Sequence, residues 1–162
     1  LINARAVPLH AGIVLGAMIA GILWLWVNRD PAKCFLAMIM TLAGWLAAVN
    51  TANDAINTIQ GSLLFGTMEG AKVYREMLGW LTGGLLGGAV GAGLTAFGTG
   101  VAATAIRRPE AWMLIVVVGA IAGLLLYSAA LLDAIILLFV PWQVAVATAI
   151  AYGLTTRDGF RA

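Results

Sequence analysis

Residues 77–106 read MLGWLTGGLLGGAVGAGLTAFGTGVAATAI, a stretch of 30 residues without a charged side chain. At about 1.5 Å per residue, a helix of this length could cross the apolar core of a bilayer, which is about 30 Å thick. In water this helix would be poor, because each interior glycine costs about 1 kcal/mol relative to alanine. In lipid an unpaired peptide group costs more, so the helix is enforced and the stretch predicts a membrane span.

The glycines of this span have the spacing of a helix-packing surface. Four of them lie four residues apart along one slowly drifting stripe, and two more lie next to it. Because glycine has no side chain, another backbone can approach closely there. We favour packing over a pore lining or the approach of a substrate or pigment, and the partner helix could belong to this chain or to another. The predicted packing positions are Gly79, Gly83, Gly84, Gly87, Gly88 and Gly91.

The composition of the 162-residue chain is that of an integral membrane protein. Hydrophobic residues make up 62% and charged residues 10% of the chain, whereas a soluble domain has about 45–50% and about 25%. The net charge of +2 comes without a dense basic patch, which argues against nucleic-acid binding. One cysteine and one histidine exclude an internal disulfide and a multi-histidine metal site. We expect a single membrane domain in a lipid bilayer, in a bacterial inner membrane.

Four further apolar runs predict an all-α polytopic bundle of about five spans, or four if the last stretch is partly re-entrant. Asp30 and Pro31 can cap the second span. A turn near Asp133 divides the last apolar stretch into two spans. Residues 55–68 have the spacing of an amphipathic segment in the interface. The predicted spans are residues 9–27, 34–52, 77–106, 111–132 and 134–155.

Basic residues in the loops predict an orientation. With five spans, Arg5, Lys72 and Arg75 lie on one side, and six basic residues lie on the other. Positive charge is retained on the cytoplasmic side, so we expect a cytoplasmic C-terminus. The six residues are Arg29, Lys33, Arg107, Arg108, Arg157 and Arg161.

Two polar features are candidate sites. Asn50, Asn53, Asp54 and Asn57 would share one face if the second helix continued, and their oxygens could then bind a cation or a polar group. We favour a helix end with turn-forming residues at these positions. Asp133 could serve a proton relay if it lay in lipid, but we favour a solvated turn.

The remaining polar residues do not form a pattern that is typical of an enzyme, so we expect no enzymatic activity. His10, at the mouth of the first span, could ligate a haem or chlorin of a neighbouring subunit, but a polar end residue is the simpler interpretation. The sequence contains no catalytic set or metal-binding motif and names no cofactor.

We expect a non-enzymatic subunit of a larger membrane complex for transport, secretion or energy conversion, with other membrane subunits as partners. The alternative is a small homo-oligomeric channel or transporter, with the glycine helix or the asparagine patch near its path.

Overall fold

A computed structural model describes residues 9–27, 29–62 and 69–155. This part of the chain is an all-α bundle without strands, and it contains five helices long and apolar enough to cross a membrane. Its elements are α1 (Leu9–Trp26), α2 (Pro31–Gly61), α3 (Glu69–Ala102), the short 3₁₀ helix η3 (Thr104–Arg107), α4 (Pro109–Gly123), α5 (Leu125–Leu131) and α6 (Ile136–Thr155). α4 and α5 together make up the fourth span.

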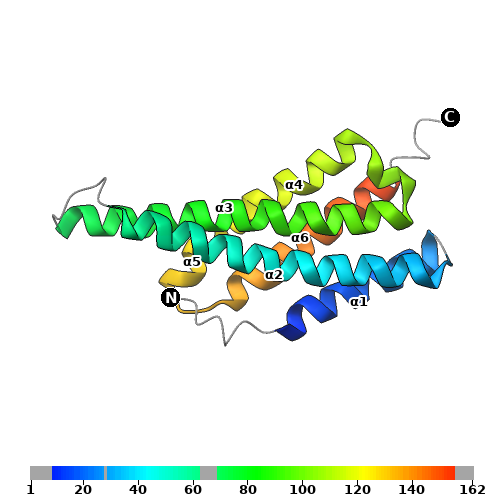
Figure 1. Ribbon diagram of the computed structural model, residues 1–162, viewed down its shortest axis with the longest axis horizontal. Coiled ribbons are helices and arrows are strands. Elements are labelled where there is room, and N and C mark those ends of the chain that lie inside the picture. Colours follow the sequence, from blue (N-terminus) through cyan, green and yellow to red (C-terminus); the bar gives the residue numbers. More distant parts are fainter. Residues whose placement is uncertain (1–8, 28, 63–68, 156–162) are drawn as a thin grey trace.

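α3 is the central helix of the bundle (Figure 1). It packs against α2 on one side and against α4 and α5 on another, while α1 lies on α2 and α6 lies on α4. Leu15, Ile19 and Leu23 of α1, Ile115 of α4 and Val146 of α6 are almost fully buried. They join small residues of α2 and α3 in one apolar core, so the core is contributed by all five spans.

α2 and α3 are longer than a bilayer requires. They have 31 and 34 residues, whereas α6 has 20, so their lengths are about 46, 51 and 30 Å. Figure 1 shows that both helices extend past the other helices at one end. We call this part, residues 57–61 of α2 and 69–79 of α3, the projecting hairpin. The Arg75 guanidinium donates to the Ser62 carbonyl at 3.3 Å and ties its two helices together.

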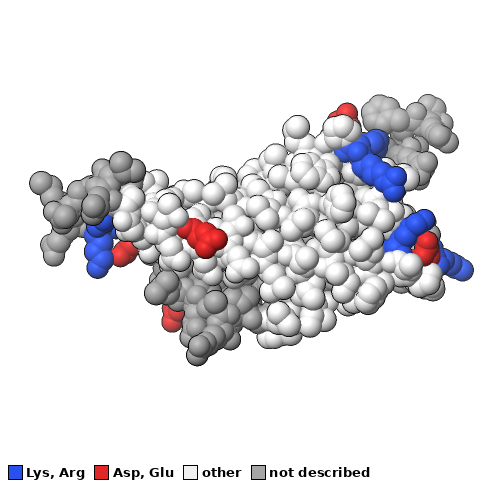
Figure 2. All heavy atoms as spheres, viewed as in Figure 1, with Lys and Arg blue, Asp and Glu red and all other residues white. Residues whose placement is uncertain are grey.

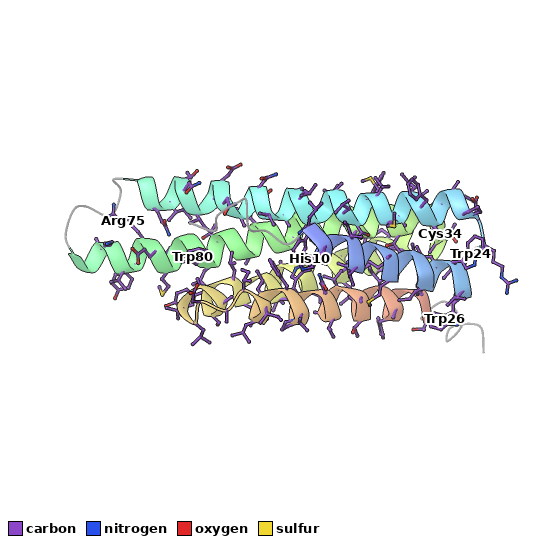
Figure 3. The ribbon with its side chains drawn as sticks, turned by 90° about the horizontal axis from the view of Figure 1, so that it is seen from below. His10, Trp24, Trp26, Cys34, Arg75 and Trp80 are labelled. Atoms are coloured by element: carbon purple, nitrogen blue, oxygen red, sulfur yellow. The ribbon has the colours of Figure 1, made fainter. Side chains whose placement is uncertain are left out.

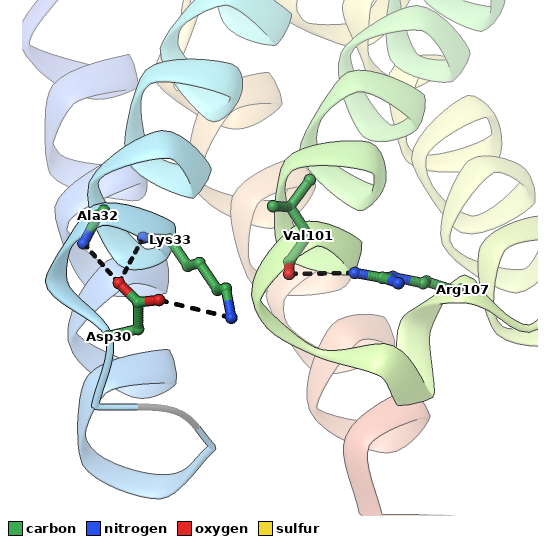
Figure 4. A network of polar contacts seen from close by, with 5 residues as sticks. All are labelled: Asp30, Ala32, Lys33, Val101 and Arg107. Atoms are coloured by element: carbon green, nitrogen blue, oxygen red, sulfur yellow. Dashed lines mark hydrogen bonds and ion pairs between the residues drawn. The ribbon is translucent and has the colours of Figure 1, made fainter.

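The start of α2 is capped as the sequence predicts. The Asp30 carboxylate accepts hydrogen bonds from the backbone N–H groups of Ala32 at 3.0 Å and Lys33 at 3.4 Å, and Pro31 occupies the first turn (Figure 4). The Lys33 ammonium lies 3.4 Å from the other carboxylate oxygen. These contacts satisfy N–H groups that have no partner within the helix.

The predicted end of the second helix is wrong. α2 runs without a break to Gly61, so residues 55–61 belong to it and not to a separate interfacial segment; residues 63–68 lie outside the described residues. Ala52 and Ile56 are buried against α3 at Gly83. This packing keeps the helix intact through asparagines and threonines whose own helix propensity is low.

Other boundaries differ by smaller amounts. α3 begins at Glu69 instead of residue 77, and an ion pair between Lys72 and Glu76, 4.0 Å apart, lies on its first exposed turns. The fourth span is interrupted at Leu124, whose N–H bonds to the Ile121 carbonyl three residues back. The turn between α5 and α6 contains Asp133 with φ at 49°, a left-handed conformation that aspartate adopts more readily than most residues.

Candidate functional site

One stripe of α3 glycines lies against α2. We call Gly79, Gly83, Gly87 and Gly91 the α2-facing stripe. A methyl carbon at Gly87 would lie 2.6 Å from the Ala48 carbonyl oxygen, and one at Gly83 would lie 2.8 Å from the Ala52 oxygen. At Gly83 and Gly87, backbone oxygens of α2 therefore occupy the space that a side chain would need.

The adjacent pair, Gly84 and Gly88, lies against two glycines of α4. A methyl carbon at Gly84 would overlap the Gly123 carbonyl, and one at Gly88 would overlap the Gly119 carbonyl. The contact is reciprocal, because a methyl at Gly123 would overlap the Gly84 carbonyl. All six predicted packing glycines thus contact helices of this chain, which answers the question that the sequence leaves open.

Gly119 and Gly123 are packing residues that the sequence analysis missed. Their spacing of four residues, small-xxx-small, was visible in the sequence and is typical of close contacts between membrane helices. It lies inside an apolar run that was interpreted as a plain span.

A cavity of about 60 Å³ lies where the two glycine surfaces of α3 meet. Gly83, Gly84, Gly87 and Gly88 form its floor. Side chains of α2 and α6 form its walls, and α4 and α5 contribute Gly123 and Leu126. No ionisable residue lines it, so the cavity is an apolar space within the membrane-spanning part of the chain.

Three aromatic rings separate α2 from α6 beside this cavity. Trp45 of α2 contacts Phe139 and Trp142 of α6 edge-to-face, with ring centroids 4.4 and 6.2 Å apart. The Trp142 indole N–H donates to the Gly119 carbonyl of α4 at 3.0 Å. The buried indole N–H of Trp45 has no hydrogen-bond acceptor among the described residues. These large rings thus line the space that α3 leaves by having no side chains, and the cavity is the part of that space that they do not fill.

Polar groups in the core are satisfied by their own helices. Thr41, Thr95 and Thr99 are fully buried, and each hydroxyl donates to the carbonyl four residues earlier, at 2.7 to 2.9 Å. The proton of each hydroxyl is therefore donated within its own helix and is not available to another helix. Through the described core, these threonines do not form a polar path across the bundle.

The predicted asparagine patch stays on one continuous helix. Asn50, Asp54 and Asn57 are exposed and Asn53 is partly buried, so the alternative of a shared helical face holds and the favoured helix end does not. Asp133 lies on a different element, in the exposed turn before α6. Among the described residues, no group of three or more His, Cys, Asp or Glu could hold a metal ion.

His10 and Cys34 lie far apart. His10 is exposed in the first turn of α1, whereas Cys34 is buried near the other end of that helix, where Trp24 and Trp26 also lie (Figure 3). Trp80 lies on α3 at the base of the projecting hairpin, beyond which Arg75 follows (Figure 3). Exposed tryptophans near helix ends are typical of the membrane interface.

Arg107 and Arg108 bind carbonyls at helix ends, a role that the sequence analysis did not foresee. Arg107 donates to the Gly100 carbonyl at 2.7 Å. It also donates to the Val101 carbonyl at 3.3 Å (Figure 4). Arg108 donates to Gly153 near the end of α6 at 3.4 Å. The last carbonyls of a helix have no partner within it, and a cation there also suits the helix dipole.

Among the described residues, charged side chains gather toward the ends of the bundle, and the face shown in Figure 2 has a wide band between them without Lys, Arg, Asp or Glu. At one end, Arg29 and Lys33 flank the start of α2, and Arg107 and Arg108 follow the end of α3. A charge-free band between two charged ends is what a bilayer core requires. Comparison of the chain with known protein families, characterised proteins and solved structures finds no match.

Proposed function

We propose that the chain is a non-enzymatic integral membrane subunit of a larger membrane assembly, joined to its partner by the projecting hairpin. The observation that carries this proposal is the excess length of α2 and α3. A helix that only crosses a bilayer needs about 20 residues. The additional turns of both helices lie outside that length and present polar side chains to another protein.

The exposed surface of this region suits a protein partner. Asn57 is exposed on the α2 part of the hairpin, and Lys72, Tyr74 and Glu76 are exposed on its α3 part. Asp54 is exposed on α2 just before the hairpin begins. A mixture of amide, aromatic and oppositely charged groups resembles the polar rim of a protein interface more than a lipid-facing surface. The hydrogen bond from Arg75 to Ser62 holds the two helices in a fixed relation.

The internal packing supports a scaffold more than a channel. The glycine stripes pack against α2 and α4 of the same chain, and the space left beside them is a cavity of about 60 Å³ without an ionisable lining residue, which is not a polar pore. The buried threonine hydroxyls are bonded to their own helices. A channel would therefore need a polar path formed between copies of the chain. Such a path requires that the chain form a homo-oligomer.

Gentle detergent extraction of the tagged chain, followed by mass measurement of the intact complex, tests the proposal. We expect other membrane subunits in fixed stoichiometry, and we expect Asp54→Arg with Asn57→Arg to release them. Leu86→Ala is the control, because Leu86 is an exposed apolar residue of α3 within its span. A homo-oligomer would favour the channel, and a lone chain would contradict both functions.

We also propose that the end of the bundle carrying Arg29 and Arg107 faces the cytoplasm, together with the C-terminus. Four basic residues lie at that end, against Lys72 and Arg75 at the other, and retained positive charge marks the cytoplasmic side. In a Cys34→Ser background, a membrane-impermeant thiol reagent should label Tyr74→Cys but not Ala32→Cys in intact cells. Both positions are exposed, so the reverse labelling would invert the orientation.

A further inference from the structure

The cavity above the α3 glycines has walls of a single chemical kind. Its floor is the backbone of Gly83 to Gly88, and its walls include Ala52, Leu126 and Leu138. None of these groups offers a charge. Of the two indoles that also line the cavity, that of Trp142 is bonded to Gly119, and the N–H of Trp45 is buried without an acceptor among the described residues. Apolar cavities of this kind stay free of water and accept apolar ligands.

The shape of the cavity follows the helices. Its lining runs from Ile135, which directly precedes α6, to Trp142 within that helix, and on α2 from Ala52 to Trp45. Seven residues of helix correspond to about 10 Å, so the cavity reaches from the turn after α5 toward the middle of the bundle. This direction is that of lipid chains in a bilayer.

The cavity reaches the surface between α2 and α6. The backbones of these two helices do not approach each other within the described chain, and the rings of Trp45, Phe139 and Trp142 meet between them. Ile135 is exposed, and Val49 and Leu138 are only partly buried. No charged residue lines this opening, so the acyl chains of a surrounding bilayer can reach it.

The volume of the cavity limits its ligand to a narrow group. About 60 Å³ is less than half of the roughly 150 Å³ of an apolar cavity that binds benzene, and far below the roughly 300 Å³ of a small drug site. A ring or a folded cofactor is therefore too large. The end of a hydrocarbon chain fits.

We propose that this cavity is a binding site for the end of a lipid acyl chain, which enters from the bilayer between α2 and α6. In this proposal the acyl chain lies on the backbone of the α3 glycines, beside the rings of Phe139 and Trp142. It completes the packing where α3 has no side chains, because an unfilled cavity forfeits dispersion contacts along its walls. The site does not depend on the proposed partner subunit.

Tryptophan quenching tests this site. Replacing Trp24, Trp26, Trp80 and Trp112 by phenylalanine leaves Trp45 and Trp142, which are 3% and 4% exposed. In phosphatidylcholine vesicles with brominated acyl chains, we expect a loss of their emission relative to unbrominated vesicles, because the cavity brings a chain into contact with them. Leu138→Phe fills the cavity and should restore the emission. Leu137→Phe, at a neighbouring exposed position outside the lining, should not.

Photo-crosslinking of the unsubstituted chain gives an independent measurement. A phosphatidylcholine with a diazirine at the end of one acyl chain should form adducts on Leu126, which is 2% exposed and lines the cavity, but not on Val146, which is buried elsewhere. Unchanged emission in brominated lipid, or no adduct on Leu126, would overturn the proposal.

Discussion

α3 meets its two main neighbours, α4 and α2, at different closeness. On the α4 side glycine faces glycine, and a methyl group at Gly84 would overlap the Gly123 carbonyl. On the α2 side glycine faces alanine, and a methyl at Gly87 would lie 2.6 Å from the Ala48 oxygen. The same residue type at the same spacing therefore has a different role, which depends on what lies opposite.

α2 and α4 also differ in how strongly their own sequences favour the helix. α2 begins at the Asp30 cap and continues for 31 residues. α4 begins with Pro109 and Glu110 but has no side-chain capping hydrogen bond at Arg108, and the fourth span is interrupted at Leu124. We infer that α4 owes its position to packing against α3, whereas α2 is supported by its own sequence as well. Disturbing the α4 contact should thus have the larger effect.

Gly84→Ala should be the most damaging of these substitutions. The added methyl overlaps backbone of α4, so the helices must separate and lose contacts along their length. Overpacking of this kind costs about 1–3 kcal/mol and occasionally more. We expect poor accumulation in membranes, and a lower midpoint in thermal denaturation of purified protein followed by circular dichroism.

The matched control for this variant is Gly93→Ala on the same helix. The nearest atom to a methyl there is 3.7 Å away, which is an ordinary contact. Alanine also favours the helix by up to about 1 kcal/mol, so this variant should be as stable as the parent. Equal stability of Gly84→Ala and Gly93→Ala would contradict the close α3–α4 contact.

On the α2 side, Gly87→Ala should cost less than Gly84→Ala, and Gly79→Ala should cost least. The Gly87 methyl requires a shift of the Ala48 carbonyl, whereas a methyl at Gly79 meets the flexible Gln60 side chain at 3.3 Å. The expected loss for Gly87→Ala is toward the lower end of about 1–3 kcal/mol. The denaturation midpoint should therefore be lowest for Gly84→Ala, higher for Gly87→Ala and highest for Gly79→Ala. A lower midpoint for Gly79→Ala than for Gly87→Ala would contradict this order.

The two cavity tryptophans extend the comparison to hydrogen bonds. Trp142→Phe removes the bond to Gly119 of α4, whereas Trp45→Phe removes an N–H without an acceptor among the described residues. A hydrogen bond of this type contributes about 0.5–1.5 kcal/mol net, and the lost ring volume is similar in both variants. The denaturation midpoint should therefore fall further for Trp142→Phe. Equal losses would mean that the bond to α4 adds little.

The sequence predicts the class of this fold because lipid restricts the alternatives. Long charge-free runs can only be spans, and clustered glycines in such a run are typical of close packing. The cap at Asp30 was predictable for a similar reason, since its pattern is local and chemically specific.

Other features depend on contacts that a sequence does not display. Asn53 and Asn57 suggest a helix end, but burial of Ala52 and Ile56 against α3 keeps α2 continuous. The partner of each glycine is set by helices distant in the sequence. The cavity is a gap between side chains of several helices, so no pattern in one segment could indicate it.

The smallest effect concerns pH and the cap of α2. Desolvation raises the pKa of Asp30, but the N–H groups of Lys33 and Ala32 and the charge of Lys33 outweigh it and hold that pKa below its ordinary value. A carboxyl group with a lowered pKa in the folded state stabilises that state above its ordinary pKa, and the contribution is lost as pH falls through the folded pKa. We therefore expect the backbone amides of Ala32 and Lys33 to lose hydrogen-exchange protection in strong acid, with α4 amides unaffected. Asp30→Asn keeps a capping oxygen that does not titrate in this range, so its protection should be independent of pH. If the parent chain and Asp30→Asn respond alike to acid, the cap does not depend on the charge of Asp30.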